Sequence, residues 1–229
     1  MTELFNIIIR SLKILFSKEI LKITIMSSFF STIIIFIFLF IFWNTLPSLG
    51  WAKKIFGGFY NTIFNYFWTY IVTSTFVFLF SPISTIISGL FLETVVRKVN
   101  LIEKQKTIND GYGFFLGVIA GLKILVLSAL VYIIILFLKW WLGLNIILAL
   151  LLQTIAIGHI LGKEYYEIVA ACNIKKLTVG EFKRDNYFNI LTTGVIISFF
   201  FIIPILNLFA PILSTILMTI KVRKLEESR

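Results

Sequence analysis

Long apolar runs separated by short polar segments dominate the sequence, and this pattern is typical of helices that enter a membrane. Four such runs lie at 23–43, 59–80, 113–141 and 144–161, and a last apolar block covers 187–220. A helix of about 20 apolar residues spans a hydrocarbon core of roughly 30 Å. The pattern predicts an all-α integral membrane protein, with a few full transmembrane helices in one membrane domain over residues 1–229.

The N-terminal segment has a different pattern from the long apolar runs. In residues 4–16, Arg10 and Lys13 alternate with isoleucine and leucine. A helix with basic residues on one face and aliphatic residues on the other lies in the plane of the membrane surface. We therefore expect an amphipathic surface helix before the first membrane-spanning helix.

Segment 81–98 follows the second apolar run and begins with a Ser-Pro pair. Pro82 is expected to kink the chain or to restart a helix there, because proline cannot donate a helical hydrogen bond. The later part of the segment is amphipathic and ends in Arg97 and Lys98. A polar loop is expected over 100–110.

The last block, 187–220, contains three residues that a simple membrane anchor does not need: Pro204, Asn207 and Pro211. Pro204 divides the block into two arms of about 16 residues, each reaching roughly 24 Å as a helix, less than a roughly 30 Å core. Two interpretations stay open. The prolines and Asn207 form the tip of a re-entrant helical hairpin, or they form a kinked anchor in which Asn207 bonds a carbonyl freed by Pro204.

Composition and charge agree with a membrane protein. Of the residues, 59% are hydrophobic and 14% are charged, whereas soluble domains have about a quarter charged residues. The net charge of +10 does not indicate nucleic-acid binding, because no basic cluster is interleaved with aromatic residues. Counted for the segments before, between and after the spans, with Lys139 assigned to the turn after the third span, Lys and Arg number four, two, four, one, five and four along the chain. Basic-rich segments stay in the cytoplasm, which predicts cytoplasmic termini and cytoplasmic ends for 187–220.

Glycines at four-residue spacing predict places where two helices pack closely. Gly113, Gly117 and Gly121 form one such row, and Gly158 and Gly162 repeat the spacing later in the chain. A row of small residues on one helix face lets a neighbouring backbone approach. We interpret both rows as helix-packing positions.

Three ionisable residues lie within or beside the apolar runs, namely Lys123, Glu164 and Glu167. Charges inside a membrane are costly, so such residues are candidates for function. Lys123 lies near the start of its helix, from which its amine can reach the cytoplasmic surface. Glu164 and Glu167 are expected to share a helix face, where Lys163 is available to neutralise one of them.

The sequence contains one histidine, His159, and one cysteine, Cys172. An internal disulfide is therefore excluded, and these two residues alone cannot hold a zinc ion. His159 is interpreted as a hydrogen-bonded packing residue. Phosphate-binding loops and hydrolase motifs are absent from the sequence, so we expect no enzymatic activity, no cofactor and no metal.

Two segments, LGKEYYEIVA at 161–170 and IPILNLFAPILSTILM at 203–218, resemble the family of CysZ sulfate permeases and etoposide-induced-type membrane proteins. The first is similar to a Gly-Arg-Glu-Tyr-Phe-Glu-like segment of the family, and the second to its Pro-x-x-Asn-Leu-x-x-Pro block. The matching positions are Gly162, Lys163, Glu164, Tyr165, Tyr166, Glu167, Lys183, Arg184, Pro204, Asn207, Leu208 and Pro211. The resemblance implies a helical protein of the bacterial inner membrane, with some paired helices that penetrate only part-way.

The function implied by the resemblance is an anion permease or channel, with sulfate uptake as the leading candidate. A tetrahedral dianion favours helix N-termini, lysine and arginine. The candidate substrate path comprises Pro204, Asn207, Pro211, Lys163, Glu164, Tyr165, Glu167, Arg97, Lys98 and Lys123. The alternative is a non-transporting membrane scaffold or lipid-organising protein of the same family. The expected partners are the lipid bilayer and a sulfate-like anion; a homo-oligomer is left open, and nucleic acid is excluded.

Overall fold

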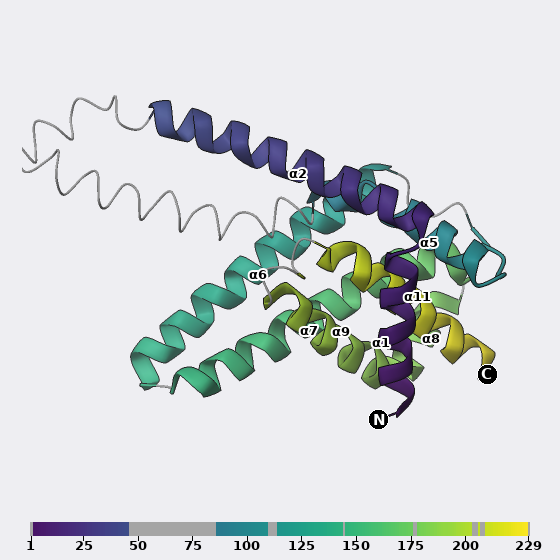
Figure 1. Ribbon diagram of the computed structural model, residues 1–229. Coiled ribbons are helices and arrows are strands. Elements are labelled where there is room, and N and C mark those ends of the chain that lie inside the picture. Colours follow the sequence, from purple (N-terminus) through teal and green to yellow (C-terminus); the bar gives the residue numbers. More distant parts are fainter. Residues whose placement is uncertain are drawn as a thin grey trace, which may run out of the picture.

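The computed structural model describes residues 2–45, 86–109, 114–143, 145–175, 178–202, 206 and 209–228. The regular elements within these ranges are helices, which confirms the predicted all-α class (Figure 1). They are α1 (Thr2–Leu15), α2 (Lys18–Thr45), α5 (Leu92–Ile102), α6 (Phe114–Leu142), α7 (Ile146–Asn173), α8 (Val179–Asp185), α9 (Tyr187–Ile202) and α11 (Ala210–Glu227).

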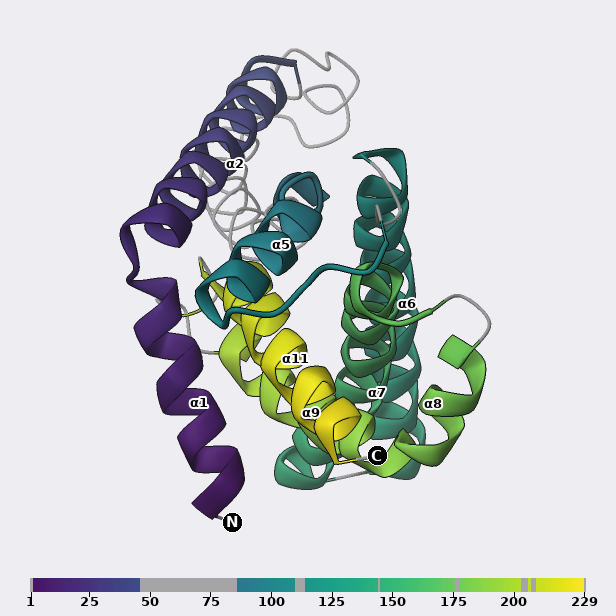
Figure 2. The same ribbon diagram turned by 90° about the vertical axis from the view of Figure 1, so that its right-hand side faces the viewer.

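Helix α11 lies at the centre of the packed helices and is surrounded by α1, α5, α7 and α9 (Figure 2). Every residue from Ala210 to Val222 is buried. Pro211 lies in the first turn of α11. Proline fits there because the first N–H groups of a helix have no intrahelical acceptor. The second arm of the last apolar block is therefore the innermost helix of the described structure.

Helices α6 and α7 form a long antiparallel pair that extends away from this centre (Figure 1). In the described part of the chain, Val118–Leu142 and Ile147–Asn173 are long and apolar enough to cross a membrane. Trp140 is 84% exposed near their turn, and its neighbour Trp141 is also exposed. Amphipathic aromatic rings favour the membrane–water boundary, which fits the position of this turn at the end of two spans.

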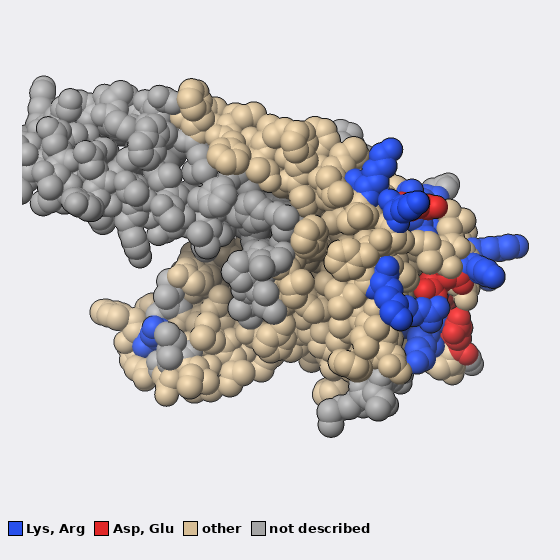
Figure 3. Space-filling model, in the orientation of Figure 1, with Lys and Arg blue, Asp and Glu red and all other residues tan. Residues whose placement is uncertain are grey.

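Charged side chains gather at the opposite end of the molecule, where both chain termini lie (Figures 1 and 3). Helix α1 runs across this end, α2 and α6 run away from it, and α7 returns toward it (Figure 1). The α6–α7 turn lies further from the charged end than the facing ends of α9 and α11 (Figure 1). One end of the protein thus carries most of the charged side chains among the described residues that Figure 3 displays, and few charged side chains appear elsewhere on their surface.

Several sequence predictions differ from the structure in their boundaries. The fourth helix does not end at Leu161 but continues to Asn173, so the Tyr-rich segment is helical. The expected loop 100–110 begins later, because α5 includes Asn100 and ends at Ile102. The polar segment before the last block contains the short helix α8. The predicted span 59–80 lies outside the described residues, as do Pro82, Gly113, Pro204 and Asn207.

Candidate functional site

The closest contact between two helices joins α7 and α9 through glycines. A Cβ atom on Gly158 would lie 2.7 Å from the Cα atom of Val195, and one on Gly162 would lie 2.7 Å from the Ile190 carbonyl oxygen. A Cβ atom on Gly194 would lie 2.1 Å from the Gly158 carbonyl oxygen. These helices touch backbone to backbone, as expected for Gly158 and Gly162, whereas Gly194 stands alone on its helix and its part in the contact was not predicted from glycine spacing.

A second glycine contact joins α6 to the helical turn that precedes α5. A Cβ atom on Gly121 would lie 2.9 Å from the Cα atom of Ile86. The close approach expected of the first glycine row is therefore present at Gly121. Gly117 belongs to α6, but its surroundings lie outside the described side chains, as does all of Gly113.

An ion pair links α6 and α7 inside the two candidate spans. The Nζ atom of Lys123 lies 2.7 Å from Oε1 of Glu164, and the lysine side chain is 44% exposed while the glutamate is 4% exposed. Each residue is about 14 Å along its helix from the end nearest the charged end, at about 1.5 Å per residue. A buried carboxylate thus holds a partly exposed ammonium group within the apolar part of the protein.

The second glutamate of α7 has a different partner. Lys183 of α8 donates a hydrogen bond of 2.7 Å to Oε1 of Glu167, and both side chains are 29% exposed. Lys163 is half-buried on the same turn of α7, but the cations paired with Glu164 and Glu167 are Lys123 and Lys183. The two carboxylates were expected to share one face; instead, Glu164 turns toward α6 and Glu167 toward α8.

The two tyrosines of the Gly-Lys-Glu-Tyr-Tyr-Glu segment have different roles. Tyr166 donates a hydrogen bond of 2.9 Å to the Val179 carbonyl and stacks on Phe182, which holds α8 against α7. Tyr165 is fully buried, and its hydroxyl group has no hydrogen-bond partner among the described residues. The same holds for the hydroxyl group of Ser214 in α11. A buried hydroxyl without a partner is costly, so both groups are candidates for binding water or a polar ligand.

The remaining basic candidates lie on α5. Lys98 forms an ion pair of 3.4 Å with Glu19 at the start of α2, and Arg97 is half-buried beside it in the chain. Lys98 therefore joins α5 to α2, whereas Lys123 joins α6 to α7. The structure does not gather these two cations into one cage around a common point.

A buried polar cluster at the charged end was missed by the sequence analysis. Asn100 of α5 donates a hydrogen bond of 2.7 Å to Asn173 of α7, and Arg223 of α11 donates one of 3.4 Å to Asn100. Arg223 also donates one of 2.6 Å to the Lys106 carbonyl. Asn100 had been assigned to a polar loop, and Asn173 lies at the end of its helix. The only sequence signal for their burial is the apolar residues beside them in α5 and α7.

Cys172 is a buried packing residue, whereas His159 is exposed, so the packing role expected for the histidine is not borne out. The Tyr187 hydroxyl lies 3.4 Å from Nδ1 of His159, which agrees with the expected hydrogen-bonded histidine. Cys172 is buried, and its carbonyl accepts hydrogen bonds from the Ile108 and Asn109 amides. Neither residue belongs to a cluster of metal-ligand type within the described ranges.

Helices that expose apolar side chains, pack through glycines and carry an ion pair within two candidate spans define an all-α membrane protein. A family model described as sulfate transporter CysZ/etoposide-induced protein 2.4 matches residues 7–211, and the chain belongs to this family of transporter type. The match confirms the resemblance seen in the sequence. No curated protein matches the chain.

Proposed function

We propose that the protein is an anion permease of the bacterial inner membrane and that sulfate is its leading substrate. The family supports a transporter, and one observation in the fold supports an anion: Lys123 is held within the apolar part of α6 by Glu164 of α7. A charged lysine at that depth is energetically costly, and such residues in membrane proteins usually have a function. Its partial exposure makes the ammonium group accessible to a visiting anion.

Glu164 stabilises the Lys123 ammonium group when no substrate is bound. Without substrate, the carboxylate neutralises the ammonium group and lowers the cost of its position in the membrane. A sulfate-like dianion that reaches Lys123 competes with Glu164 and forms charge-assisted hydrogen bonds to the same group. The site therefore binds the anion by exchange of partners, and the buried carboxylate restores the resting pair after release.

We place the charged end in the cytoplasm, in agreement with the excess of basic residues there. In this orientation α9 and α11 form a re-entrant hairpin that enters and returns on the cytoplasmic side. Helix α9 has 16 residues, or roughly 24 Å, which is less than a core of roughly 30 Å. Pro204 and Asn207 belong to the connection between the two arms, where we propose that backbone carbonyls and the Asn207 amide face the substrate path.

The test is uptake of labelled sulfate into proteoliposomes, normalised to folded protein. Lys123→Met should lower uptake about tenfold or more, because it removes a charge-assisted contact worth roughly 1.5–3 kcal/mol. The matched control is Lys139→Met, since Lys139 is an exposed cation in the last turn of the same helix. Equal uptake by the two variants would exclude Lys123 from the path.

A companion variant separates the hairpin tip from the ion pair. Asn207→Leu preserves side-chain size but removes the amide, and it should lower uptake while expression stays near the wild-type level. If the amide only caps a carbonyl, the loss is a membrane hydrogen bond of about 0.6–2 kcal/mol in stability, and uptake per folded molecule does not change. Absence of sulfate uptake by the wild-type protein would favour the non-transporting scaffold instead.

A further inference from the structure

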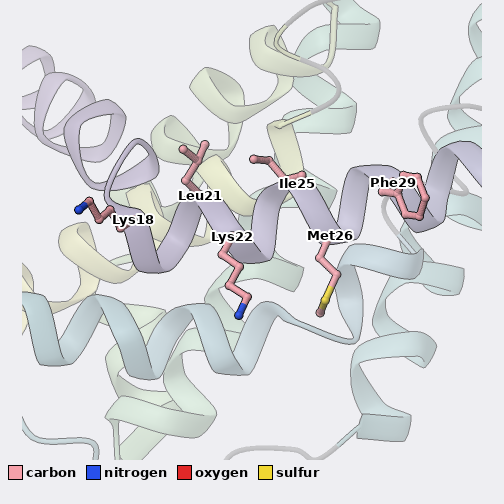
Figure 4. Close-up of a pocket in the computed structure, with 6 residues that line it drawn as sticks. All are labelled: Lys18, Leu21, Lys22, Ile25, Met26 and Phe29. Carbon is pink, nitrogen blue, oxygen red and sulfur yellow. The ribbon is translucent and has the colours of Figure 1, made fainter.

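A shallow groove of about 520 Å³, widely open to the outside, runs along one side of α2 near its start (Figure 4). Its lining residues are Lys18, Leu21, Lys22, Ile25, Met26 and Phe29. These residues are spaced three and four apart, so they form two neighbouring ridges on one face of the helix. The two lysines occupy the end of the groove nearest the start of α2, and its other end is apolar.

The lysines at this end are available to a ligand. Lys18 and Lys22 are exposed, and neither forms an ion pair with a described residue. The acidic residue between them, Glu19, is engaged by Lys98 of α5 at 3.4 Å. The carboxylate nearest in sequence is thus already paired, and the groove carries an excess of positive charge at the charged end of the molecule.

The apolar end of the groove is open to the outside. Ile25 is 58% exposed and Phe29 is 61% exposed. From Lys18 to Phe29 the helix rises about 16 Å at 1.5 Å per residue, which matches one leaflet of a core of roughly 30 Å. Lysines at the boundary and an apolar channel one leaflet long match the two parts of a phospholipid.

We propose that this groove binds one anionic phospholipid, with its phosphate between Lys18 and Lys22 and an acyl chain along Ile25, Met26 and Phe29. The site is separate from the proposed sulfate path, and it does not depend on transport. A zwitterionic lipid of the same chain length fills the apolar channel but gains less from the lysines, because its headgroup carries no net charge. An inorganic anion gains from the lysines alone and leaves the channel empty.

The experiment measures retained lipid on the purified full-length protein by native mass spectrometry in detergent. The probes are dioleoyl phosphatidylglycerol and dioleoyl phosphatidylcholine, added in equal amounts. The wild-type protein should retain the anionic lipid preferentially. Each lysine contributes about fivefold, so Lys18→Gln with Lys22→Gln should reduce that preference about thirtyfold.

Three further variants test whether the preference for the anionic lipid arises at the groove. Lys13→Gln removes an exposed charge of α1 that does not line the groove, and it should leave the preference unchanged. Lys18→Arg with Lys22→Arg should restore it, because arginine also binds phosphate. Met26→Trp obstructs the apolar channel and should lower retention of both lipids while the lysines remain.

Equal retention of the two lipids by the wild-type protein would overturn the proposal, and so would equal effects of the groove variants and Lys13→Gln. Complete displacement of phosphatidylglycerol by millimolar inorganic phosphate would show that the site recognises a free oxyanion and not a lipid. Unaltered helicity and elution volume of each variant establish that a loss of lipid is not a loss of fold.

Discussion

In soluble proteins the more apolar of two helices is usually the more buried one, and helices α6 and α11 show the reverse. Helix α6 is the more apolar of the two, yet Ile133, Ile134 and Phe137 on it are exposed. Helix α11 carries Ser214 and Thr215 in its sequence, and it is buried over most of its length. Lipid tails are as apolar as leucine, so an apolar helix gains little by leaving them. Which helix is buried in this protein therefore depends on packing and hydrogen bonding, and the hydrophobicity of a helix alone does not predict its burial.

The hydroxyl groups of α11 illustrate how polar residues are accommodated inside. Thr215 donates a hydrogen bond of 2.9 Å to the Pro211 carbonyl, and Thr219 donates one of 2.7 Å to the Thr215 carbonyl. Both donors are satisfied within their own helix, so burying them costs little. Small side chains of this kind also let α1, α5, α7 and α9 surround α11 closely.

The largest expected effect comes from breaking the interior contact between α7 and α9. Gly194→Ala should destabilise the protein by about 3 kcal/mol, because the new Cβ atom would lie 2.1 Å from the Gly158 carbonyl oxygen. The control is Gly180→Ala, since a Cβ atom there meets no described atom within 4 Å. Thermal unfolding in detergent measures both. Similar melting temperatures would mean that the two helices do not touch at Gly194.

A smaller loss of stability is expected from breaking the ion pair between the exposed helix α6 and α7. Lys123→Met should cost roughly 2 kcal/mol, because it leaves the buried Glu164 carboxylate without its cation. The value falls below that of a fully buried pair, since Lys123 is partly exposed to its surroundings. Adding Glu164→Gln should recover most of the loss. Additive losses in this double-mutant cycle, measured by chemical unfolding, would argue against a direct pair.

The smallest expected change in stability comes from replacing two buried serines, Ser198 and Ser214, by alanine. The single hydroxyl hydrogen of Ser198 is shared between the Thr154 and Val195 carbonyls, whereas the Ser214 hydroxyl has no partner among the described residues. Ser198→Ala should cost about 0.6 kcal/mol, the typical value of a membrane hydrogen bond. Ser214→Ala should be neutral or slightly stabilising, because it removes an unsatisfied group. A clear loss at Ser214, measured by the same unfolding, would reveal a bound water or ligand there.

The helices themselves were largely predictable from the sequence. The alternation of basic and apolar residues in 4–16 matches α1, and the run at 113–141 matches α6 within one residue at each end. The arm before Pro204 matches α9, which has the 16 residues expected of it. These predictions succeed because a hydrophobic pattern and a proline act on the local chain, whatever surrounds it. The family, too, was recognisable from the motifs at 161–170 and 203–218.

The partners of the polar residues were decided by the tertiary structure. Lys163 lies next to Glu164 in the sequence, but the fold brings Lys123 of another helix to that carboxylate. Gly194 has no glycine at four-residue spacing in its own helix, yet it completes the contact of Gly158 and Gly162. Asn100 and Asn173 meet across α5 and α7. A helix turns every 3.6 residues, so each residue points toward whichever neighbour the packing supplies, and that neighbour depends on the whole assembled bundle.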